Sequence, residues 1–206
     1  MTLPLTPVAD IVLRRLGRAD YLPTLEAMRR FTRERDEGTA DELWLLEHAP
    51  VYTLGQGAAP VRVANGIPVI AADRGGEITY HGPGQVVLYT LIDLARRGMK
   101  VKPFVRLLEQ AVIDLLGSKA MRRPGAPGVY VDGAKVAALG IRVTRGRAYH
   151  GLALNVDMDL APFSAIDPCG YPGLPVTQTR ALGFAEGVDA MGERLAANVI
   201  RHLEHA

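Results

Sequence analysis

Residues 128–156 constrain the fold more than any other part of the sequence. This segment reads GVYVDGAKVAALGIRVTRGRAYHGLALNV, three runs rich in strand-forming residues that are joined at Asp132-Gly133 and at Arg145-Gly146. Both dipeptides are good hairpin signals, because a two-residue hairpin turn needs positive φ, which glycine adopts without strain. The segment therefore predicts an antiparallel meander.

The rest of the chain adds further strands and a few helices. The strand-like runs are ELWLLEH (42–48), VYTLG (51–55), IPVIAADRGG (67–76), EITYHG (77–82) and QVVLYTLIDL (85–94). Residues 20–35, with Leu22, Leu25, Met28 and Phe31 on one face, predict an amphipathic helix, and 103–116 and 188–203 predict two more. We therefore predict an α+β fold, with a mixed, largely antiparallel sheet and flanking helices.

Length and charge narrow the class of protein. A chain of 206 residues can bury one sizeable core, so we expect a single domain over residues 1–206. No run approaches the roughly 18 apolar residues of a membrane span, and Pro4, Pro7 and Asp10 interrupt the stretch where a signal peptide would be apolar. We expect a cytoplasmic protein without a membrane partner. The net charge of +2 is too small to argue for nucleic acid, and we expect basic groups such as 96–102 to be solvated surface charge.

A glycine-rich stretch, RGGEITYHGPGQ (74–85), predicts a site at strand ends. Ordering its four glycines costs entropy unless the backbone must approach something closely. The stretch contains neither GxxxxGK[ST] nor GxGxxG, so a nucleotide is poorly supported. Two interpretations stay open: a narrow slot for an extended acyl chain, with N–H groups near Gly75, Gly76 and Gly140 stabilising an oxyanion, or tight turns only.

Cys169 is the only cysteine, which excludes an internal disulfide and a multi-cysteine zinc site. A lone cysteine is usually a small buried residue. Here it lies in DPCGYPG (167–173), a segment too rich in proline and glycine for a central strand or helix, so a nucleophilic thiol is an equally good interpretation. Only the thiolate attacks, so such a nucleophile needs a partner.

Lys135 and His81 are the two candidate partners. Only four of the 24 basic residues are lysines, and Lys135 lies in the apolar run GAKVAALG (133–140). Burial disfavours a charged amine, so a buried lysine can take a proton from a thiol, which arginine cannot do. The alternative for Lys135 is the solvent face of an edge strand. The position of His81 among the glycines favours substrate contact or the orienting of a loop. His48 and His150 favour structural roles, and no spacing of His, Asp or Glu indicates a metal site.

At these positions the chain resembles the lipoyl(octanoyl) transferases, also called octanoyl-[acyl-carrier-protein]:protein octanoyltransferases. The matching motifs span most of the chain: VYTLGQ (51–56), RGGEITYHGPGQVVLY (74–89), GVYVDGAKVAALGIRV (128–143), HGLALNV (150–156) and DPCGYPG (167–173). The chain departs from the family pattern at Thr90, where many members have a proline after the tyrosine. This difference bears on a local bend of the strand and not on the chemistry.

The resemblance implies the fold of the catalytic modules of lipoate and biotin protein ligases, and an acyltransferase that acts in lipoate biosynthesis and protein lipoylation. An octanoyl group would pass from acyl carrier protein to a lysine of a lipoyl domain. The resemblance also implies that Cys169 carries the acyl group as a thioester and that Lys135 is its acid/base partner. The residues implied to line the acyl substrate are Arg74, Gly75, Gly76, Glu77, Ile78, Thr79, Tyr80, His81, Ala138, Leu139, Gly140, Gly151, Leu152 and Ala153.

The resemblance further implies no metal and no cofactor, because the acyl group arrives on the phosphopantetheine of acyl carrier protein. The expected partners are this carrier and the lipoyl domains of 2-oxoacid dehydrogenases and of the glycine cleavage H protein, and we expect a monomer. Two other functions stay open. An ATP-dependent lipoate or biotin protein ligase would share the fold without needing a cysteine nucleophile, and a non-catalytic scaffold would only hold the carrier.

An acyl slot would select chain length in two different ways. Each buried methylene contributes about 0.8 kcal/mol, so a slot favours eight carbons over six by a few kcal/mol at most. Rejection of longer chains must come from a closed end.

Overall fold

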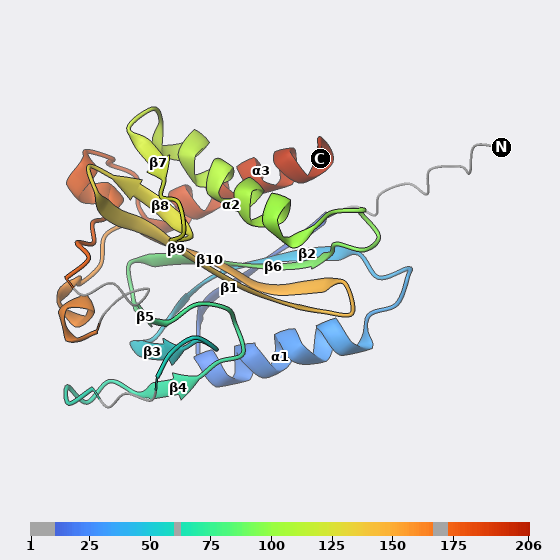
Figure 1. Cartoon of the computed structure of the whole chain (residues 1–206), viewed down its shortest axis with the longest axis horizontal. Helices are drawn as coiled ribbons and strands as arrows, with labels where there is room; N and C mark the ends of the chain where they lie inside the picture. Colours follow the sequence, from blue (N-terminus) through green and yellow to red (C-terminus); the bar gives the residue numbers. More distant parts are fainter. Residues whose placement is uncertain (1–10, 60–62, 167–172) are drawn as a thin grey trace.

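The computed structural model describes residues 11–59, 63–166 and 173–206, and a seven-stranded sheet forms the centre of this part of the chain (Figure 1). The strands lie in the order β1 (Ile11–Ala19), β2 (Asp41–His48), β6 (Gln85–Asp93), β10 (Arg147–Asn155), β9 (Ala134–Thr144), β8 (Gly128–Val131) and β7 (Ala120–Arg122). β1 is parallel to β2, and the other neighbouring pairs are antiparallel. The predicted α+β fold with a mixed, largely antiparallel sheet is confirmed.

The meander predicted from residues 128–156 forms β8, β9 and β10. The first turn has φ values of 50° at Asp132 and 82° at Gly133, and the second has 50° at Arg145 and 77° at Gly146. Positive φ at both central residues gives a turn whose twist matches that of the flanking strands. Both hairpin predictions are confirmed.

A smaller sheet contains β4 (Val69–Ala71), β3 (Val51–Leu54) and β5 (Ile78–His81), in that order. β3 is parallel to β4 and antiparallel to β5. The strands expected in this region are present, but they pair with one another and not with the large sheet. The glycine-rich stretch connects the two sheets, since it contains β5, leads into β6, and Gly75 N donates to Ile141 O of β9 at 3.0 Å.

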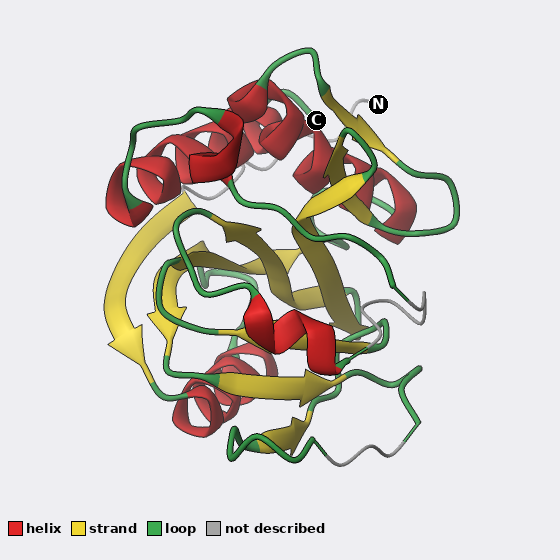
Figure 2. Cartoon of the chain, turned by 90° about the vertical axis from the view of Figure 1, so that its left-hand side faces the viewer, coloured by secondary structure: helices red, strands yellow, loops and turns green. Residues whose placement is uncertain are grey.

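Three helices cover the large sheet in the described part of the chain: α1 (Tyr21–Glu34), α2 (Val101–Leu116) and α3 (Val188–Glu204). α2 and α3 pack together on one face, while α1 and the smaller sheet lie on the other (Figures 1 and 2). Because both faces are covered, all nine residues of β6 are buried. Leu88 and Ile92 pack toward α2 and α3, and Val87 and Leu91 pack toward α1.

The helix predictions are confirmed with one correction. Pro103 lies in the first turn of α2, and Gly117, with a φ of 87°, ends it. On α1, however, Leu22 is 50% exposed, and Tyr21 takes its place in the core beside Leu25. The described residues contain no helix that is both long and apolar enough to cross a membrane.

The expectation of solvated surface charge is wrong for Arg96 and Arg97. Both donate to the buried carboxylate of Asp41, at 2.8 and 2.7 Å, and Arg35 donates to the same carboxylate at 2.6 Å. The side chain of Arg97 is only 4% exposed. These arginines are therefore part of a buried ion cluster.

Candidate functional site

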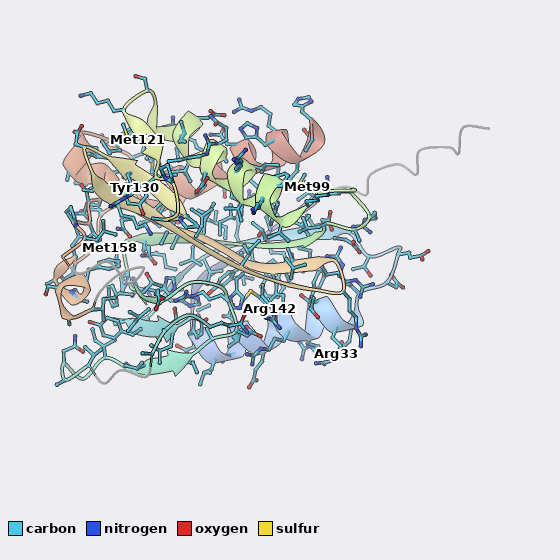
Figure 3. All side chains as sticks on the ribbon, viewed as in Figure 1. Arg33, Met99, Met121, Tyr130, Arg142 and Met158 are labelled. Atoms are coloured by element: carbon cyan, nitrogen blue, oxygen red, sulfur yellow. The ribbon has the colours of Figure 1, made fainter. Side chains whose placement is uncertain are left out.

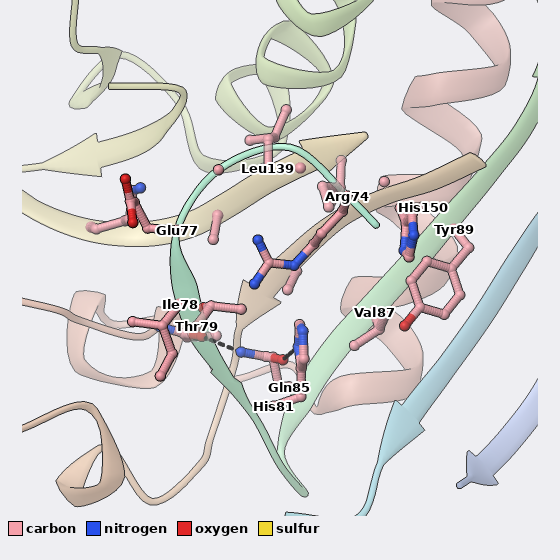
Figure 4. A pocket seen from close by; sticks show the side chains of 18 of the residues that line it. Arg74, Glu77, Ile78, Thr79, His81, Gln85, Val87, Tyr89, Leu139 and His150 are labelled. Carbon is pink, nitrogen blue, oxygen red and sulfur yellow. Dashed lines mark hydrogen bonds between the residues drawn. The ribbon is translucent and has the colours of Figure 1, made fainter. Parts of the chain in front are cut away.

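The described residues enclose a cavity between the glycine-rich stretch and the strands β6, β9 and β10 of the large sheet (Figure 4). Its empty space is about 740 Å³, including the open mouth. All the residues predicted to line the acyl substrate contribute to its wall except Gly75 and Tyr80. Segments predicted from three separate motifs are thus brought together around one space.

Gly75 and Tyr80 have other contacts. The N–H of Gly75 already donates to Ile141 O, so it is not available to stabilise an oxyanion. The ring of Tyr80 packs against Tyr52 and Phe163, with centroids 5.4 and 5.5 Å apart. Both residues therefore support the cavity wall from behind.

The glycines allow the backbone to pack against itself. A Cβ added at Gly55 would lie 2.1 Å from Gly76 O, one at Gly140 would lie 2.8 Å from Gly75 O, and one at Gly151 would lie 2.1 Å from Leu88 O. Gly76 also needs its positive φ of 85°. The glycines therefore do permit a close backbone approach, as the sequence suggested. At these positions the group that approaches is a neighbouring stretch of backbone.

Lys135 lines the cavity and is only 3% exposed, which rules out the solvent face of an edge strand. Its Nζ donates to Pro127 O at 3.1 Å and lies 5.3 Å from the ring centroid of Tyr130, which is labelled in Figure 3. Its backbone N donates to Pro175 O at 2.8 Å, and its carbonyl accepts from Thr177 N at 2.9 Å. The backbone of Lys135 is therefore tied to the segment that follows DPCGYPG.

Cys169 lies outside the described residues, so its contact with Lys135 stays a prediction. Phe163 and Val176, on either side of it in the chain, both line the cavity. The described chain therefore reaches the cavity wall three positions before it stops at Ile166 and three positions after it resumes at Gly173.

Arg74 projects into the cavity, as Figure 4 shows, but its guanidinium is held by the protein. Nη2 donates to Thr53 O at 2.7 Å and to Thr53 Oγ1 at 2.8 Å, and Nη1 donates to Gly75 O at 3.0 Å. The side chain is buried. Arg74 thus fixes the start of the glycine-rich stretch to β3.

His81 is held in one orientation in the cavity wall. Its Nδ1 lies 2.7 Å from Gln85 Oε1, while Gln85 Nε2 donates to Asn155 Oδ1 at 2.9 Å (Figure 4). Burial lowers the pKa of His81 to about 3, so its ring is neutral at pH 7. His48 has the structural role expected for it, because its ring nitrogens contact Ala19 O and Tyr89 Oη at 2.6 and 2.7 Å.

His150 lies in the cavity wall as well as in a structural contact. Its Nε2 is 2.8 Å from Asp73 Oδ1, and Tyr149 donates to Asp73 Oδ2 at 2.7 Å. The rings of Tyr149 and His150 stack with their centroids 5.0 Å apart. In a regular strand, neighbouring side chains point to opposite faces of the sheet and could not stack in this way. The φ of 61° at His150 breaks that alternation, and Thr90 Oγ1 donates to its carbonyl at 3.0 Å.

Sequence reasoning missed several residues of the wall. They are Tyr21, Gln85, Val87, Tyr89, Asn155, Phe163 and Val176, and His150 was assigned a structural role alone. Gln85, Val87 and Tyr89 lie inside the motif at 74–89 and Asn155 lies inside the motif at 150–156, so these four could have been found there. Among residues 11–59, 63–166 and 173–206, no group of three His, Cys, Asp or Glu side chains is placed to hold a metal ion.

Comparisons with known proteins agree with this geometry. The sequence matches the family described as lipoyl protein ligase A/B catalytic domain over residues 20–199. Curated relatives named Octanoyltransferase include one from Azoarcus sp. (strain BH72), which is 58% identical over 199 residues, covering 94% of this chain and 88% of the relative.

Solved structures show the same fold at low sequence identity. A putative lipoate protein ligase from T. acidophilum with bound lipoic acid has a TM-score of 0.69 and 17% identity, covering 95% of this chain and 86% of that one. A biotin protein ligase from Aquifex aeolicus in complex with biotin and ATP has a TM-score of 0.56 and 8% identity, covering 95% and 70%. The chain therefore belongs to the lipoyl protein ligase A/B catalytic-domain family, as an acyltransferase of its octanoyltransferase group.

Proposed function

We propose that this protein transfers an octanoyl group from octanoyl-acyl carrier protein to a lysine of a lipoyl domain, through a thioester on Cys169. The observation that carries the proposal is a cavity with a buried lysine in its wall, to which Phe163 and Val176, on either side of Cys169 in the chain, also contribute. The octanoyltransferase relatives support the same reaction.

The cavity walls suit an acyl chain. Val87, Ala138 and Ala153 present apolar side chains on the cavity side of the sheet, and each methylene buried against them contributes about 0.8 kcal/mol. The polar side chains His81 and Gln85 are satisfied by each other and by Asn155. The chain thus fits without leaving those groups unpaired.

Lys135 and Cys169 divide the chemistry between them. The amine of Lys135 takes the thiol proton, the thiolate attacks the carbonyl carbon of the carrier's thioester, and the pantetheine sulfur leaves and recovers the proton. The amine of the target lysine then attacks the acyl-enzyme and gives its proton to Lys135, while the Cys169 sulfur leaves. An amide is more stable than a thioester, so no ATP is consumed. Support comes from the backbone bonds that join Lys135 to Pro175 and Thr177, shortly after Cys169.

The proposed partners follow from this reaction. A soluble acyl carrier protein would deliver the octanoyl group on its phosphopantetheine, so the enzyme itself would need no cofactor, and we place the reaction in the cytoplasm. Lipoyl domains would accept the group. In support, one solved structure with this fold is of a bi-partite lipoate protein ligase and its E2 lipoyl domain from Thermoplasma acidophilum.

Intact mass spectrometry tests the proposal. Enzyme mixed with octanoyl-acyl carrier protein should gain the mass of one octanoyl group, located on Cys169 by peptide mapping, and should lose it when a lipoyl domain is added. Cys169→Ala should neither gain the group nor transfer it. Full transfer by Cys169→Ala, or transfer without any adduct, would rule out the thioester route.

ATP dependence separates the proposal from a ligase. The protein should transfer octanoate from the carrier without ATP, and should not catalyse exchange of pyrophosphate into ATP in the presence of lipoate or biotin. Exchange without transfer would identify a ligase instead.

A further inference from the structure

A chain of side-chain hydrogen bonds runs along the cavity wall and ends at Thr177. His81 Nδ1 lies 2.7 Å from Gln85 Oε1, and Gln85 Nε2 donates to Asn155 Oδ1 at 2.9 Å. Asn155 Nδ2 in turn donates to Thr177 O at 2.9 Å. All three side chains are buried, and Asn155 is only 5% exposed. Asn155 therefore connects the glycine-rich stretch to the segment that follows Cys169.

The amide of Asn155 has one orientation that satisfies both of its neighbours. Thr177 O is a carbonyl oxygen and can only accept, so it must face the NH₂ group of Asn155. The amide oxygen of Asn155 then faces Gln85 Nε2, which is a donor. A carboxylate at this position could not donate to Thr177, and an apolar side chain could serve neither neighbour.

Thr177 belongs to a short segment that is tied to Lys135, residues 173–177, which we call the return segment. In the described part of the chain, three hydrogen bonds hold the return segment to the large sheet. Lys135 N donates to Pro175 O at 2.8 Å, and Thr177 N donates to Lys135 O at 2.9 Å, as in a parallel bridge. The third bond comes from Asn155 Nδ2, so a side chain helps the backbone to fix the return segment in place.

Lys135 itself is held independently of Asn155. It pairs with Tyr130 of β8, and its Nζ donates to Pro127 O at 3.1 Å. Loss of the bond from Asn155 would therefore loosen the return segment while Lys135 stays in the cavity wall.

We propose that Asn155 is a positioning residue for the acyl transfer and acts through its bond to Thr177. This bond fixes the return segment beside Lys135, and the fixed segment sets how closely the Cys169 thiol approaches the Lys135 amine. The inference rests on the proposed thioester route. The return segment begins four positions after Cys169, so a displacement of the segment carries over to the thiol. A misplacement of about 1 Å between reacting groups can reduce a rate about 100-fold.

Alkylation of Cys169 tests this role without any substrate. Cys169 is the only cysteine, so the mass gained from iodoacetamide measures the reaction of this thiol alone. A free thiol has a pKa of about 8.5 and is about 3% ionised at pH 7, whereas a thiol beside a basic amine reacts faster at this pH. The alkylation rate is measured between about pH 5 and 10 in the wild type and in Asn155→Leu, which has a side chain of similar shape without the amide.

Asn155→Leu should be alkylated about tenfold more slowly than the wild type at pH 7, and the midpoint of its pH profile should lie about one pH unit higher. Circular dichroism establishes that the variant is folded, since an unfolded chain would also expose a thiol of ordinary pKa. If Asn155→Leu is unfolded, Asn155→Ala removes the same amide and should shift the profile in the same direction.

Asn198→Leu is the matched control. Asn198 Nδ2 also donates to a backbone carbonyl, Ala111 O at 3.1 Å, but it lies on α3 and does not line the acyl cavity. The alkylation profile of Asn198→Leu should equal that of the wild type.

A second background tests whether Asn155 acts through Lys135. Lys135→Gln should by itself move the alkylation profile toward that of a free cysteine, because the amine is gone. Adding Asn155→Leu to Lys135→Gln should then cause no further shift, whereas two residues that act on the thiol separately would give additive shifts.

Three results would overturn the inference: an unchanged profile in the folded Asn155 variants, an equal shift in Asn198→Leu, or a full additional shift in the Lys135→Gln background. Each differs from a failure of the proposed function, in which wild-type enzyme mixed with octanoyl-acyl carrier protein would form no adduct on Cys169.

Discussion

Gly128 provides the space that the side chain of Lys135 occupies. A Cβ added at residue 128 would lie 2.6 Å from Lys135 Cε and 2.7 Å from Ala137 O. The carbonyl belongs to β9 and cannot retreat without breaking the pairing with β8. A side chain at this position would therefore displace the amine from the cavity wall.

Gly128→Ala should reduce acyl transfer about 100-fold, since a misplacement of about 1 Å is enough for such a loss. The measurement is the single-turnover rate of adduct formation on Cys169. Gly125→Ala is the control, because residue 125 also has a positive φ, 76°, but open space around an added Cβ. Equal losses of rate in the two variants would show that backbone strain, and not the displaced amine, is responsible.

Replacement of Lys135 by arginine tests whether the amine must lose its charge. Arginine can still donate to Pro127 O, but it stays protonated and cannot accept the thiol proton. Lys135→Arg should therefore slow adduct formation by about 100-fold or more. Lys119→Arg, an exposed lysine outside the cavity, should react at the wild-type rate. A Lys135→Arg enzyme of near wild-type rate would mean that Lys135 serves only as a cation.

At the scale of elements, the sequence predicted those strands and helices whose signals are local. The two hairpins follow from Asp132-Gly133 and Arg145-Gly146, and the end of α2 follows from Gly117. β1 was not expected, because most of its residues are exposed and it shows no apolar alternation; it forms by pairing with β2. The separation of a smaller sheet depends on pairing between distant strands, which periodicity cannot predict.

Asp41 joins two loops that lie far apart in the sequence, one after α1 and one after β6. Its carboxylate binds Arg35 at the end of α1, Arg96 and Arg97 after β6, and the backbone N of Asp93. Burial raises the pKa of Asp41, but the hydrogen bonds from Asp93 N, Arg35 and Arg97 outweigh this and hold the pKa below its usual value. The carboxylate is therefore ionised and balances part of the buried positive charge.

Asp41→Ala should lower the free energy of unfolding by about 3–5 kcal/mol, because it leaves buried guanidinium groups without their partner. Urea denaturation measures the change. Asp157→Ala removes an exposed carboxylate that pairs with Arg180 at 3.2 Å and should cost less than about 1 kcal/mol. A similar small loss in Asp41→Ala would mean that the cluster contributes little to stability.

At the scale of the whole molecule, the site exists only because distant segments meet across two sheets. The resemblance to the octanoyltransferases implied the parts from residues 74–81, 138–140 and 151–153, because each lies within a motif that matches the family. Tyr21 carries no such pattern. Tyr21 lines the cavity because α1 packs against the sheet, so its place in the wall depends on tertiary packing alone.

The neutral state of His81 makes the stability of the whole molecule depend on pH. Its pKa is about 3 in the fold, mainly because of burial, and about 6.5 when unfolded. Between these values the unfolded chain binds a proton that the folded chain does not, so this contribution to stability is complete above pH 6.5 and is lost as the pH falls.

His81→Asn removes that proton site and keeps an amide that can donate to Gln85 Oε1. Urea denaturation at several pH values should show that wild-type stability falls more steeply than that of His81→Asn between about pH 6.5 and 4, by up to about 1.4 kcal/mol per pH unit. His205→Asn, at the exposed end of α3, should follow the wild-type slope. Parallel curves for wild type and His81→Asn would mean that His81 is as easily protonated in the folded molecule as in the unfolded chain, and that its position in the cavity wall does not keep it neutral.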